Sequence, residues 1–404
     1  MVRLLPLLLL CFYHSYGQKS NRIFSKTGQV TIDKTVFDKI PNDVKIIGLG
    51  EFTHGGREVV LYKTELCKYL IENQSVKQII FEYSDINLRP INNYLLDDNQ
   101  KFSDEKIKSL VNAQLKNSIF FTEEYIDFFI WLKHHNLKSK QKVKFRGFDT
   151  IVPVPIPYLT HNYLTKIDTN FVNKNIERWA LPHNDSLAIS NIYDWFEKNK
   201  DKIKSKLKEE DFQLCSMDIR NAKAYITQRH LKKRHQDYET YRDSLMAVNV
   251  CELADSKSVV WAHNAHILPI TDYYKKEDKK TYYQILTKRL GSFLREKYGN
   301  QYFTIATTYS KEATIAVLKE ETPISVFPFE NKSFKCPNYA FPFFLRGKYK
   351  FKEGVLLSDN ELLQKKRPLM LSDLDLFGKE IMLIVDDLDI LVILENVTPI
   401  RILK

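Results

Sequence analysis

The first third of the chain alternates between short apolar runs and segments with helical periodicity. The apolar runs predict strands at residues 44–49, 77–83 and 143–148. Between them, apolar residues recur every three or four positions, for example at Val59, Tyr62, Leu66 and Leu70, which predicts amphipathic helices at 57–73 and 125–137. This alternation of strands and helices is typical of a parallel sheet flanked by helices.

The middle of the chain has no strand pattern. From about residue 160 to 255, charged stretches with periodic apolar residues predict a helical insertion, including one long helix near 217–253. Strand patterns then return at 258–262 and 302–307, with a predicted helix at 281–298, and residues 313–318 and 381–394 add further β character. We therefore expect an α/β fold with a mostly parallel sheet flanked by helices, and a helical insertion between the third and fourth core strands.

Residues 1–17 have the composition of a secretory signal peptide. Arg3 precedes an apolar run at 4–13, and Ser15 and Gly17 are small residues at positions −3 and −1 of a cut before Gln18. The run is shorter than the roughly 20 residues that span a bilayer, and no later segment reads as transmembrane. We expect an exported protein, periplasmic or secreted, whose residues 18–404 form one α/β domain. Lipidation at Cys11 is the alternative.

Composition and charge exclude several classes of protein. With 44% hydrophobic and 27% charged residues, the 404-residue chain can bury a large core and is not disordered. Lys and Arg exceed Asp and Glu by 61 − 50 = 11, but the lysines are scattered, which indicates a solvated basic surface rather than nucleic-acid binding. No C-x-x-C motif occurs among the cysteines after the leader, and one unassigned disulfide is left open: Cys67, Cys215, Cys251 and Cys336.

Titratable side chains stand at the ends of the predicted core strands. Six of them occupy these positions in chain order: Glu51, His54, Glu82, Asp149, His263 and His266. In a parallel sheet the carboxyl ends of the strands meet at one edge, and open α/β sheets bind ligands there. The sequence therefore predicts one site that contains three histidines and three acids.

Simpler structural explanations exist for the same residues. Glu51 favours the N-terminus of the following helix, His54 in a tight turn would ordinarily be solvated, and Asp149 is typical of a turn. Glu82 lies in the apolar run IIFEY, so it must be paired, protonated or at the end of its strand. Asp243 lies on an apolar helical stripe and requires a partner from another element.

Several familiar catalytic motifs are missing from the sequence. It contains no G-x-S-x-G serine elbow, no H-E-x-x-H zinc motif and no G-x-G-x-x-G turn. The segment GEFTHGG has glycines at P-loop spacing but lacks the Lys–Ser/Thr pair. Three histidines and a carboxylate keep a metal-dependent hydrolase open. A non-catalytic protein that holds a cofactor such as haem through a histidine is a further alternative.

Seven segments of the chain together resemble the erythromycin esterase family. They are GEFTHGGREVV (50–60), IIFEY (79–83), GFDT (147–150), RDSLMAVNV (242–250), VVWAHNAHI (259–267), LGSFLREKYG (290–299) and LENVTPIR (394–401). The resemblance covers about residues 40–404, and the first and fifth segments are its most specific parts. It implies a hydrolase that uses no metal or other cofactor, with an α/β core and a helical region around a deep cleft.

The resemblance also implies roles for individual residues. The family's general base is the histidine of the first motif, which is His54. Further positions match the family's site: Glu51, Arg57, Glu82, His263 and His266. Phe52, Gly56 and Leu290 differ from the residues usual at their positions, and residues 268–280 are rich in Tyr and Lys, so the substrate is described only as an ester or lactone.

Together these observations predict an exported hydrolase that activates water directly. We expect His54 to take a proton from water while Glu51 or Glu82 holds its other ring nitrogen. Arg57, with His263 or His266, is expected to stabilise the oxyanion. Three further residues are expected to support these groups or to contact the substrate: Asp149, Asp243 and Asn264. The expected partner is a small ester or lactone, with no nucleic acid, cofactor, metal or stable membrane insertion.

Overall fold

The three strands expected from the first third of the chain all belong to one sheet. The computed structural model describes residues 22–25, 27–99, 102–179, 185–234, 237–276, 282–284, 288–319, 329–364 and 366–403. The predicted signal peptide at 1–17, with Cys11, lies outside these ranges. No helix within them combines a membrane-spanning length with the apolar character that spanning requires.

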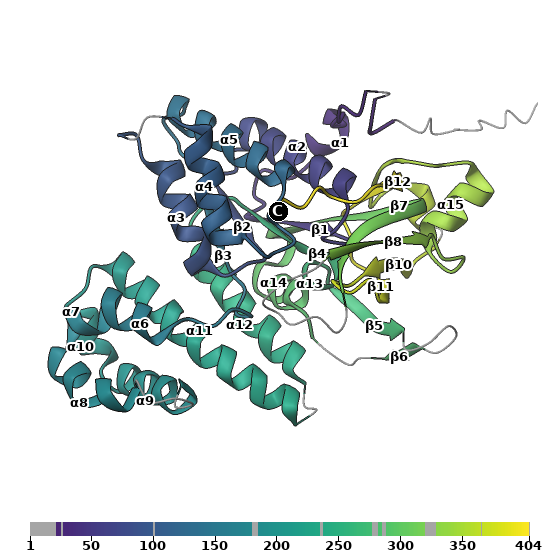
Figure 1. Ribbon diagram of the computed structural model, residues 1–404. Helices are drawn as coiled ribbons and strands as arrows, with labels where there is room; N and C mark the ends of the chain where they lie inside the picture. Colours follow the sequence, from purple (N-terminus) through teal and green to yellow (C-terminus); the bar gives the residue numbers. More distant parts are fainter. Residues whose placement is uncertain are drawn as a thin grey trace, which may run out of the picture.

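Eight strands form the main sheet. They are β1 (Ile46–Glu51), β2 (Gln78–Phe81), β3 (Lys144–Gly147), β4 (Ser258–His263), β7 (Tyr302–Leu318), β8 (Phe329–Lys335), β9 (Gly354–Leu357) and β12 (Ile390–Val397). Their order is β3-β2-β4-β1-β7-β12-β9, with β8 paired to β7 (Figure 1). The first six strands in this order run parallel, and β8 and β9 are antiparallel to their neighbours. The predicted mostly parallel sheet is therefore confirmed.

Helices cover both faces of this sheet, which explains why β1 and β4 are buried along their whole length and mostly apolar. One face packs against α2 (Arg57–Asn73), α3 (Asp85–Leu96), α4 (Asp104–Leu115) and α5 (Glu123–Lys138). The other face packs against α12 (Tyr238–Leu253), α13 (Asn264–Ile267) and α14 (Leu290–Tyr298). Shorter helices lie elsewhere: α1 (Lys34–Phe37), a 3₁₀ turn (Gly299–Gln301), α15 (Phe341–Tyr349) and α16 (Glu361–Gln364).

The predicted helical insertion is confirmed between β3 and β4. It contains α6 (Ile156–Leu159), a π-helical turn (Thr160–Leu164), α7 (Thr165–Ile167), α8 (Thr169–Trp179), α9 (Asp185–Lys198), α10 (Lys200–Lys204) and α11 (Glu209–Lys233), and it leads into α12. These helices form a separate lobe below the sheet in Figure 1 and have an apolar core of their own. The prediction of a single long helix at 217–253 is wrong. Asp237 accepts a hydrogen bond from the Thr240 N–H and starts a new helix.

A second, antiparallel sheet was not expected from the sequence. Its order is β10 (Leu369–Leu374), β11 (Glu380–Val385), β5 (Ile270–Lys276) and β6 (Tyr282–Gln284). The helix predicted at 281–298 is therefore wrong in its first part, where 282–284 pair with β5, and correct from Leu290 onward. The β segment at 381–394 is two strands in different sheets, because Asp387 and Asp389 pair with Arg295 and interrupt it.

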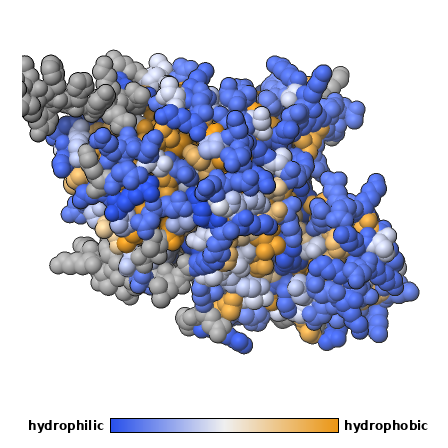
Figure 2. Space-filling view, turned by 180° about the vertical axis from the view of Figure 1, so that it is seen from behind, coloured by the Kyte–Doolittle hydropathy of each residue, from blue (hydrophilic) through white to orange (hydrophobic). Residues whose placement is uncertain are grey.

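Two smaller features complete the comparison with the sequence. Residues 302–307 and 313–318 belong to one strand, β7, because the residues between them remain paired with β12. The four cysteines within the described ranges are free thiols, of which Cys251 is half-buried and the other three are buried. On the face in Figure 2, hydrophilic side chains cover most of the surface, with smaller hydrophobic patches between them.

Candidate active site

The carboxyl ends of the central strands bring the predicted residues to one edge of the main sheet. Glu51 and His263 are register partners at the ends of β1 and β4, and Phe81, the residue before Glu82, is paired with Trp261. The rings of His54 and His263 lie with their centroids 5.4 Å apart. Residues separated by more than 200 positions in sequence therefore meet in one cluster, as expected for a parallel sheet.

His54 is held by a tight turn that follows β1. The Phe52 carbonyl accepts hydrogen bonds from the Leu374 N–H of β10 at 2.8 Å and from His263 Nε2 at 3.2 Å. Gly55 packs directly against β7, where a Cβ atom would lie 1.9 Å from the Ala316 carbonyl oxygen. Only glycine fits at this position, so the turn that carries His54 is fixed on both sides.

Glu51 connects His54 to a buried ammonium group. Its Oε1 lies 2.6 Å from His54 Nδ1, and its Oε2 accepts hydrogen bonds from Lys63 Nζ and from Trp261 Nε1, each at 2.8 Å. Burial would raise the pKa of Glu51, but Lys63 and His54 hold it below its usual value. Glu51 is therefore a carboxylate that faces one nitrogen of His54.

The same contacts set the protonation of the two basic groups. Burial would lower the pKa of His54, but the hydrogen bond with Glu51 and the charge of Glu82 raise it above the usual value. Burial lowers the pKa of Lys63 to about 8 despite its contact with Glu51. With Nδ1 facing the carboxylate, the neutral His54 ring carries its proton on Nδ1 and its lone pair on Nε2.

Glu82 and Asp149 share an arginine that was not among the predicted site residues. Glu82 accepts the His263 N–H at 2.8 Å, and Arg242 of α12 donates to Glu82 at 3.4 Å. Two nitrogen atoms of Arg242 bind the two oxygens of Asp149 at 2.9 and 2.6 Å. Burial would raise the pKa of Glu82, but the charges of His266, His54 and Arg242 lower it.

His266 has carboxylates beside both ring nitrogens. Its Nδ1 lies 2.9 Å from Asp243, and its Nε2 lies 3.3 Å from Glu82 and 3.3 Å from Arg242. Asp243 also accepts the Leu290 N–H and lies 3.4 Å from Arg289 Nε, so its expected partner does come from other elements. Burial would raise the pKa of Asp243, but Arg289 and His266 hold it below its usual value.

His263 uses both ring nitrogens for contacts within the protein. Its Nε2 lies 3.2 Å from the carbonyl oxygens of Phe52 and Leu374, and its Nδ1 accepts the Ala265 N–H at 3.2 Å. Burial and the charge of His54 lower the pKa of His263 to about 3. The neighbouring Asn264 donates from Nδ2 to the Thr307 carbonyl at 2.8 Å and to Asp373 at 3.0 Å.

Arg57 lies apart from this cluster. Its Nε donates to Glu124 of α5 at 3.0 Å, and its side chain is 34% exposed. Within the described residues, no hydrogen bond or ion pair joins Arg57 to the histidines. The positive charge beside Glu82 comes instead from Arg242.

Sequence reasoning missed four residues that contact the predicted ones: Lys63, Arg242, Trp261 and Asp373. A signal existed for two of them. Lys63 lies four residues after Val59 on the apolar stripe of α2. Asp373 lies on the same face of β10 as Leu369 and Leu371, which precede it at every second position. A charge on an apolar stripe is the same signal that identified Asp243.

The histidines are not arranged as a metal site. Within the described ranges, no group of three or more His, Cys, Asp or Glu side chains has the geometry to hold a metal ion. Five of the six ring nitrogens of His54, His263 and His266 have a protein partner in the described part of the chain, and His54 Nε2 has none. The side chain of His54 is 14% exposed.

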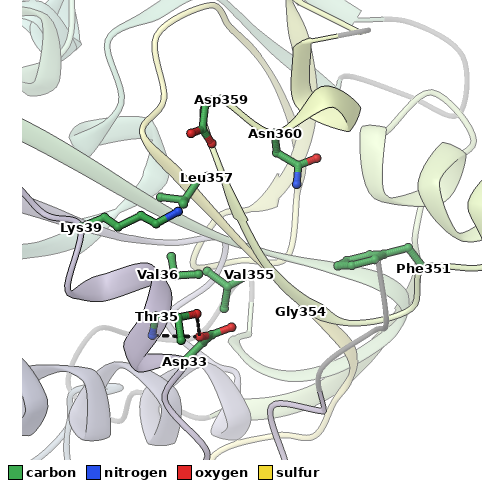
Figure 3. Close-up of a pocket in the computed structure, with 10 residues that line it drawn as sticks. All are labelled: Asp33, Thr35, Val36, Lys39, Phe351, Gly354, Val355, Leu357, Asp359 and Asn360. Atoms are coloured by element: carbon green, nitrogen blue, oxygen red, sulfur yellow. Dashed lines mark hydrogen bonds between the residues drawn. The ribbon is translucent and has the colours of Figure 1, made fainter. Parts of the chain in front are cut away.

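A separate cavity lies at the far edge of the main sheet. It has a volume of about 330 Å³ and lies between α1 and β9, with Lys39 and Asp359 among its polar residues (Figure 3). None of its ten labelled residues is a histidine, and β7 and β12 separate β9 from β1 in the sheet. This cavity is therefore distinct from the histidine cluster.

Comparisons with known proteins agree with this arrangement. Residues 71–334 match the family model for erythromycin esterase. The chain is 23% identical to erythromycin esterase type II of Escherichia coli over an alignment of 340 residues, and the match covers 74% of this chain and 77% of that protein. The range matched by the family model, 71–334, includes Glu82, Asp149, His263 and His266, and the turn with His54 precedes it.

Solved structures show the same fold. A protein of Bacillus cereus superimposes with a TM-score of 0.70 and 20% identity, and the match covers 92% of this chain and 93% of that protein. A histidine-to-asparagine mutant of the erythromycin esterase EreC, in its open conformation, superimposes with a TM-score of 0.65 and 17% identity over 91% of this chain and 95% of that protein. With the family model matching more than half of its length, this chain belongs to the erythromycin esterase family of hydrolases.

Proposed function

We propose that this chain hydrolyses carboxylic esters or lactones with water that His54 activates directly. The supporting observation is the state of the His54 ring, whose Nδ1 faces the Glu51 carboxylate at 2.6 Å while its Nε2 has no partner in the described part of the chain. A general base needs a free lone pair that faces the substrate and a group that fixes its tautomer. Among the three clustered histidines, His54 alone combines a carboxylate beside Nδ1 with an Nε2 that has no partner in the described part of the chain, which supports the proposal.

In the proposed reaction, water lies between His54 and the ester carbonyl. Its oxygen forms a bond to the carbonyl carbon as His54 Nε2 takes its proton, which gives a tetrahedral oxyanion. The bond to the alkoxy oxygen then breaks, and the leaving alkoxide takes the proton from His54. The products are a carboxylic acid and an alcohol, or a hydroxy acid from a lactone. Glu51 stabilises the imidazolium during these steps, and Lys63 keeps Glu51 ionised.

Arg242 and His266 are the groups that we assign to the oxyanion. They lie beside Glu82, at the same sheet edge as His54, whereas Arg57 pairs with Glu124 and His263 Nε2 faces the backbone carbonyl oxygens of Phe52 and Leu374. A donor aimed at a developing oxyanion contributes roughly 3–4 kcal/mol to the rate. This assignment replaces Arg57 and His263 in that role and keeps His266.

The proposed substrate is a small ester or lactone. A relative with 23% identity is named erythromycin esterase type II, and a hydrolase whose base acts on water requires only a carbonyl centre within reach of that base. We also propose that the protein is exported after cleavage before Gln18, on the signal-peptide pattern of residues 1–17. Mass spectrometry of the exported protein should give a chain that begins at Gln18, and an intact N-terminus would contradict export by this route.

The test is a panel of lactones and aryl esters assayed with the wild type and with His54→Asn. We expect His54→Asn to lower kcat/KM by about 10²- to 10⁴-fold, the usual contribution of a general base. His230→Asn, at an exposed position of α11, is the matched control and should keep full activity. A folded His54→Asn variant with wild-type turnover would contradict the proposal. Activity that is lost with chelator and restored by a metal ion would support the metal-dependent alternative.

A further inference from the structure

Asp373 is a buried acid behind the proposed site. It lies on β10 of the second sheet, is fully buried, and its Oδ1 accepts the Asn264 side-chain N–H at 3.0 Å. Its Oδ2 has no hydrogen-bond partner and lies 3.5 Å from His263 Nδ1. No lysine or arginine pairs with Asp373 in the described part of the chain. An ionised carboxylate in this position would have no compensating charge.

The contacts of His263 determine where its own proton lies. Its Nε2 faces two carbonyl oxygens, of Phe52 and Leu374, so this nitrogen must carry a hydrogen. Its Nδ1 accepts the backbone N–H of Ala265, so this nitrogen must carry a lone pair. The ring is therefore neutral, with its proton on Nε2, and it provides no positive charge for Asp373.

Two lone pairs would face each other if Asp373 were ionised. Its Oδ2 and His263 Nδ1 are both acceptors in that state, 3.5 Å apart in a fully buried position. A proton on Oδ2 removes the unpaired charge and places a donor opposite Nδ1. We propose that Asp373 is a neutral carboxylic acid whose Oδ2–H faces His263 Nδ1 and fixes the tautomer of that ring, as a positioning residue for the turn that carries His54.

The link to His54 is direct. With its proton on Nε2, His263 donates to the Phe52 carbonyl, two residues before His54. The neighbour of Asp373, Leu374, donates its N–H to the same carbonyl and accepts from His263 Nε2. The second sheet therefore fixes the His54 turn through two adjacent residues of β10. This role rests on the proposed function of His54.

The local electrostatics agree with a neutral acid. Burial raises the pKa of Asp373 well above its usual value, and the charge of Glu51 adds to this increase, while Asn264 and His54 oppose it. Buried carboxylic acids that remain protonated near neutral pH act as hydrogen-bond donors in other enzyme sites.

The test compares two near-isosteric substitutions. Asp373→Asn replaces the acid with a neutral group that still accepts from Asn264 and presents an N–H to His263, so kcat/KM on an accepted ester should stay within about fivefold of wild type. Asp373→Leu removes both interactions and should lower kcat while KM changes little. If Asp373 were instead an ionised partner of a catalytic histidine, Asp373→Asn would lower kcat by about 10⁴-fold, and this result would overturn the proposal.

Spectroscopy gives a readout that does not depend on hydrolysis. The ¹⁵N shifts of His263, assigned through His263→Gln, should show a protonated Nε2 and an unprotonated Nδ1 in the wild type and in Asp373→Asn. An infrared band of a protonated carboxyl group should be present in the wild type and lost in Asp373→Asn. A proton on Nδ1, or no such band, would overturn the proposal. These results hold whether or not an ester substrate is found, so they separate this proposal from the proposed function.

Discussion

His54 and His266 have similar surroundings at one ring nitrogen and different surroundings at the other. In each, a carboxylate lies beside Nδ1, Glu51 at 2.6 Å from His54 and Asp243 at 2.9 Å from His266. Behind each carboxylate lies a buried cation, which is Lys63 for Glu51. For Asp243 it is Arg289, which pairs also with Glu239 at 2.6 Å.

The difference lies at the second ring nitrogen. His54 Nε2 has no partner in the described part of the chain, whereas His266 Nε2 lies 3.3 Å from both Glu82 and Arg242. A base must exchange a proton with the substrate, and a ring that is held at both nitrogens can only present a fixed charge or dipole. The comparison therefore supports the proposed roles, in which His54 transfers the proton and His266 stabilises the oxyanion.

The largest expected effect separates the two carboxylates. Glu51→Gln keeps the shape of the side chain but favours the wrong tautomer of His54, so kcat should fall by about 10⁴-fold, as for the acid of a catalytic triad. Asp243→Asn should lower kcat clearly less than Glu51→Gln, because His266 transfers no proton in the proposed reaction. The measurement is kcat and KM on one accepted ester. Equal losses in the two variants would remove the distinction between the histidines.

The next effect concerns the two buried cations. Lys63→Met leaves Glu51 without its cation, and Arg289→Met does the same to Asp243, so each should lower the free energy of unfolding by about 3–5 kcal/mol. Lys68→Met is the control. Lys68 pairs with Glu65 one turn earlier on the same helix, and because this pair is partly exposed it contributes about 1 kcal/mol or less. Urea denaturation measures all three, and a loss for Lys63→Met as small as that of the control would contradict the proposed support of Glu51.

A third effect distinguishes the two arginines. Arg242→Gln should lower kcat/KM by about 10²- to 10³-fold, because it removes the proposed oxyanion donor. Arg57→Gln, whose partner is Glu124, should lower it by less than about tenfold. The comparison uses variants shown by circular dichroism to be folded. A larger loss of kcat/KM for Arg57→Gln than for Arg242→Gln would instead support Arg57 as the oxyanion donor that the sequence predicted.

The smallest effect is a shift of the pH profile. The base must be neutral to act, so kcat/KM should rise with pH along a limb centred at the raised pKa of His54, above the usual value of about 6.5. The charge of Lys63 lowers this pKa, so Lys63→Met should move the limb to higher pH, by about one unit or less. A shift to lower pH would contradict the assignment of that limb to His54.

Much of this site follows from the sequence because strand ends are easy to locate. Fully buried parallel strands read as apolar runs, and Glu51, Glu82 and His263 stand where such runs stop. A parallel sheet then determines that these ends meet. The pairing of each histidine was not predictable, because it depends on side-chain directions that no spacing encodes: Glu51 rather than Glu82 holds His54.

The second sheet was not predictable for a different reason. Its strands come from two distant parts of the chain, and β5 follows directly after the short helix that carries His266. Lysines and tyrosines in this region hide the strand pattern. Asp373 and Leu374 lie at the site because β10 pairs with β11 in the second sheet, and only the structure shows this pairing.

The position of β1 has a consequence for motion within the molecule. The strand is paired along both edges, to β4 and β7, and Ile46 and Ile47 pack into the cores on its opposite faces. Amides in such a strand exchange with solvent only when the whole domain opens, whereas a peripheral lobe with a core of its own can unfold locally. The helical lobe can therefore fluctuate while the residue that we assign to proton transfer stays anchored directly after a strand that is paired along both edges.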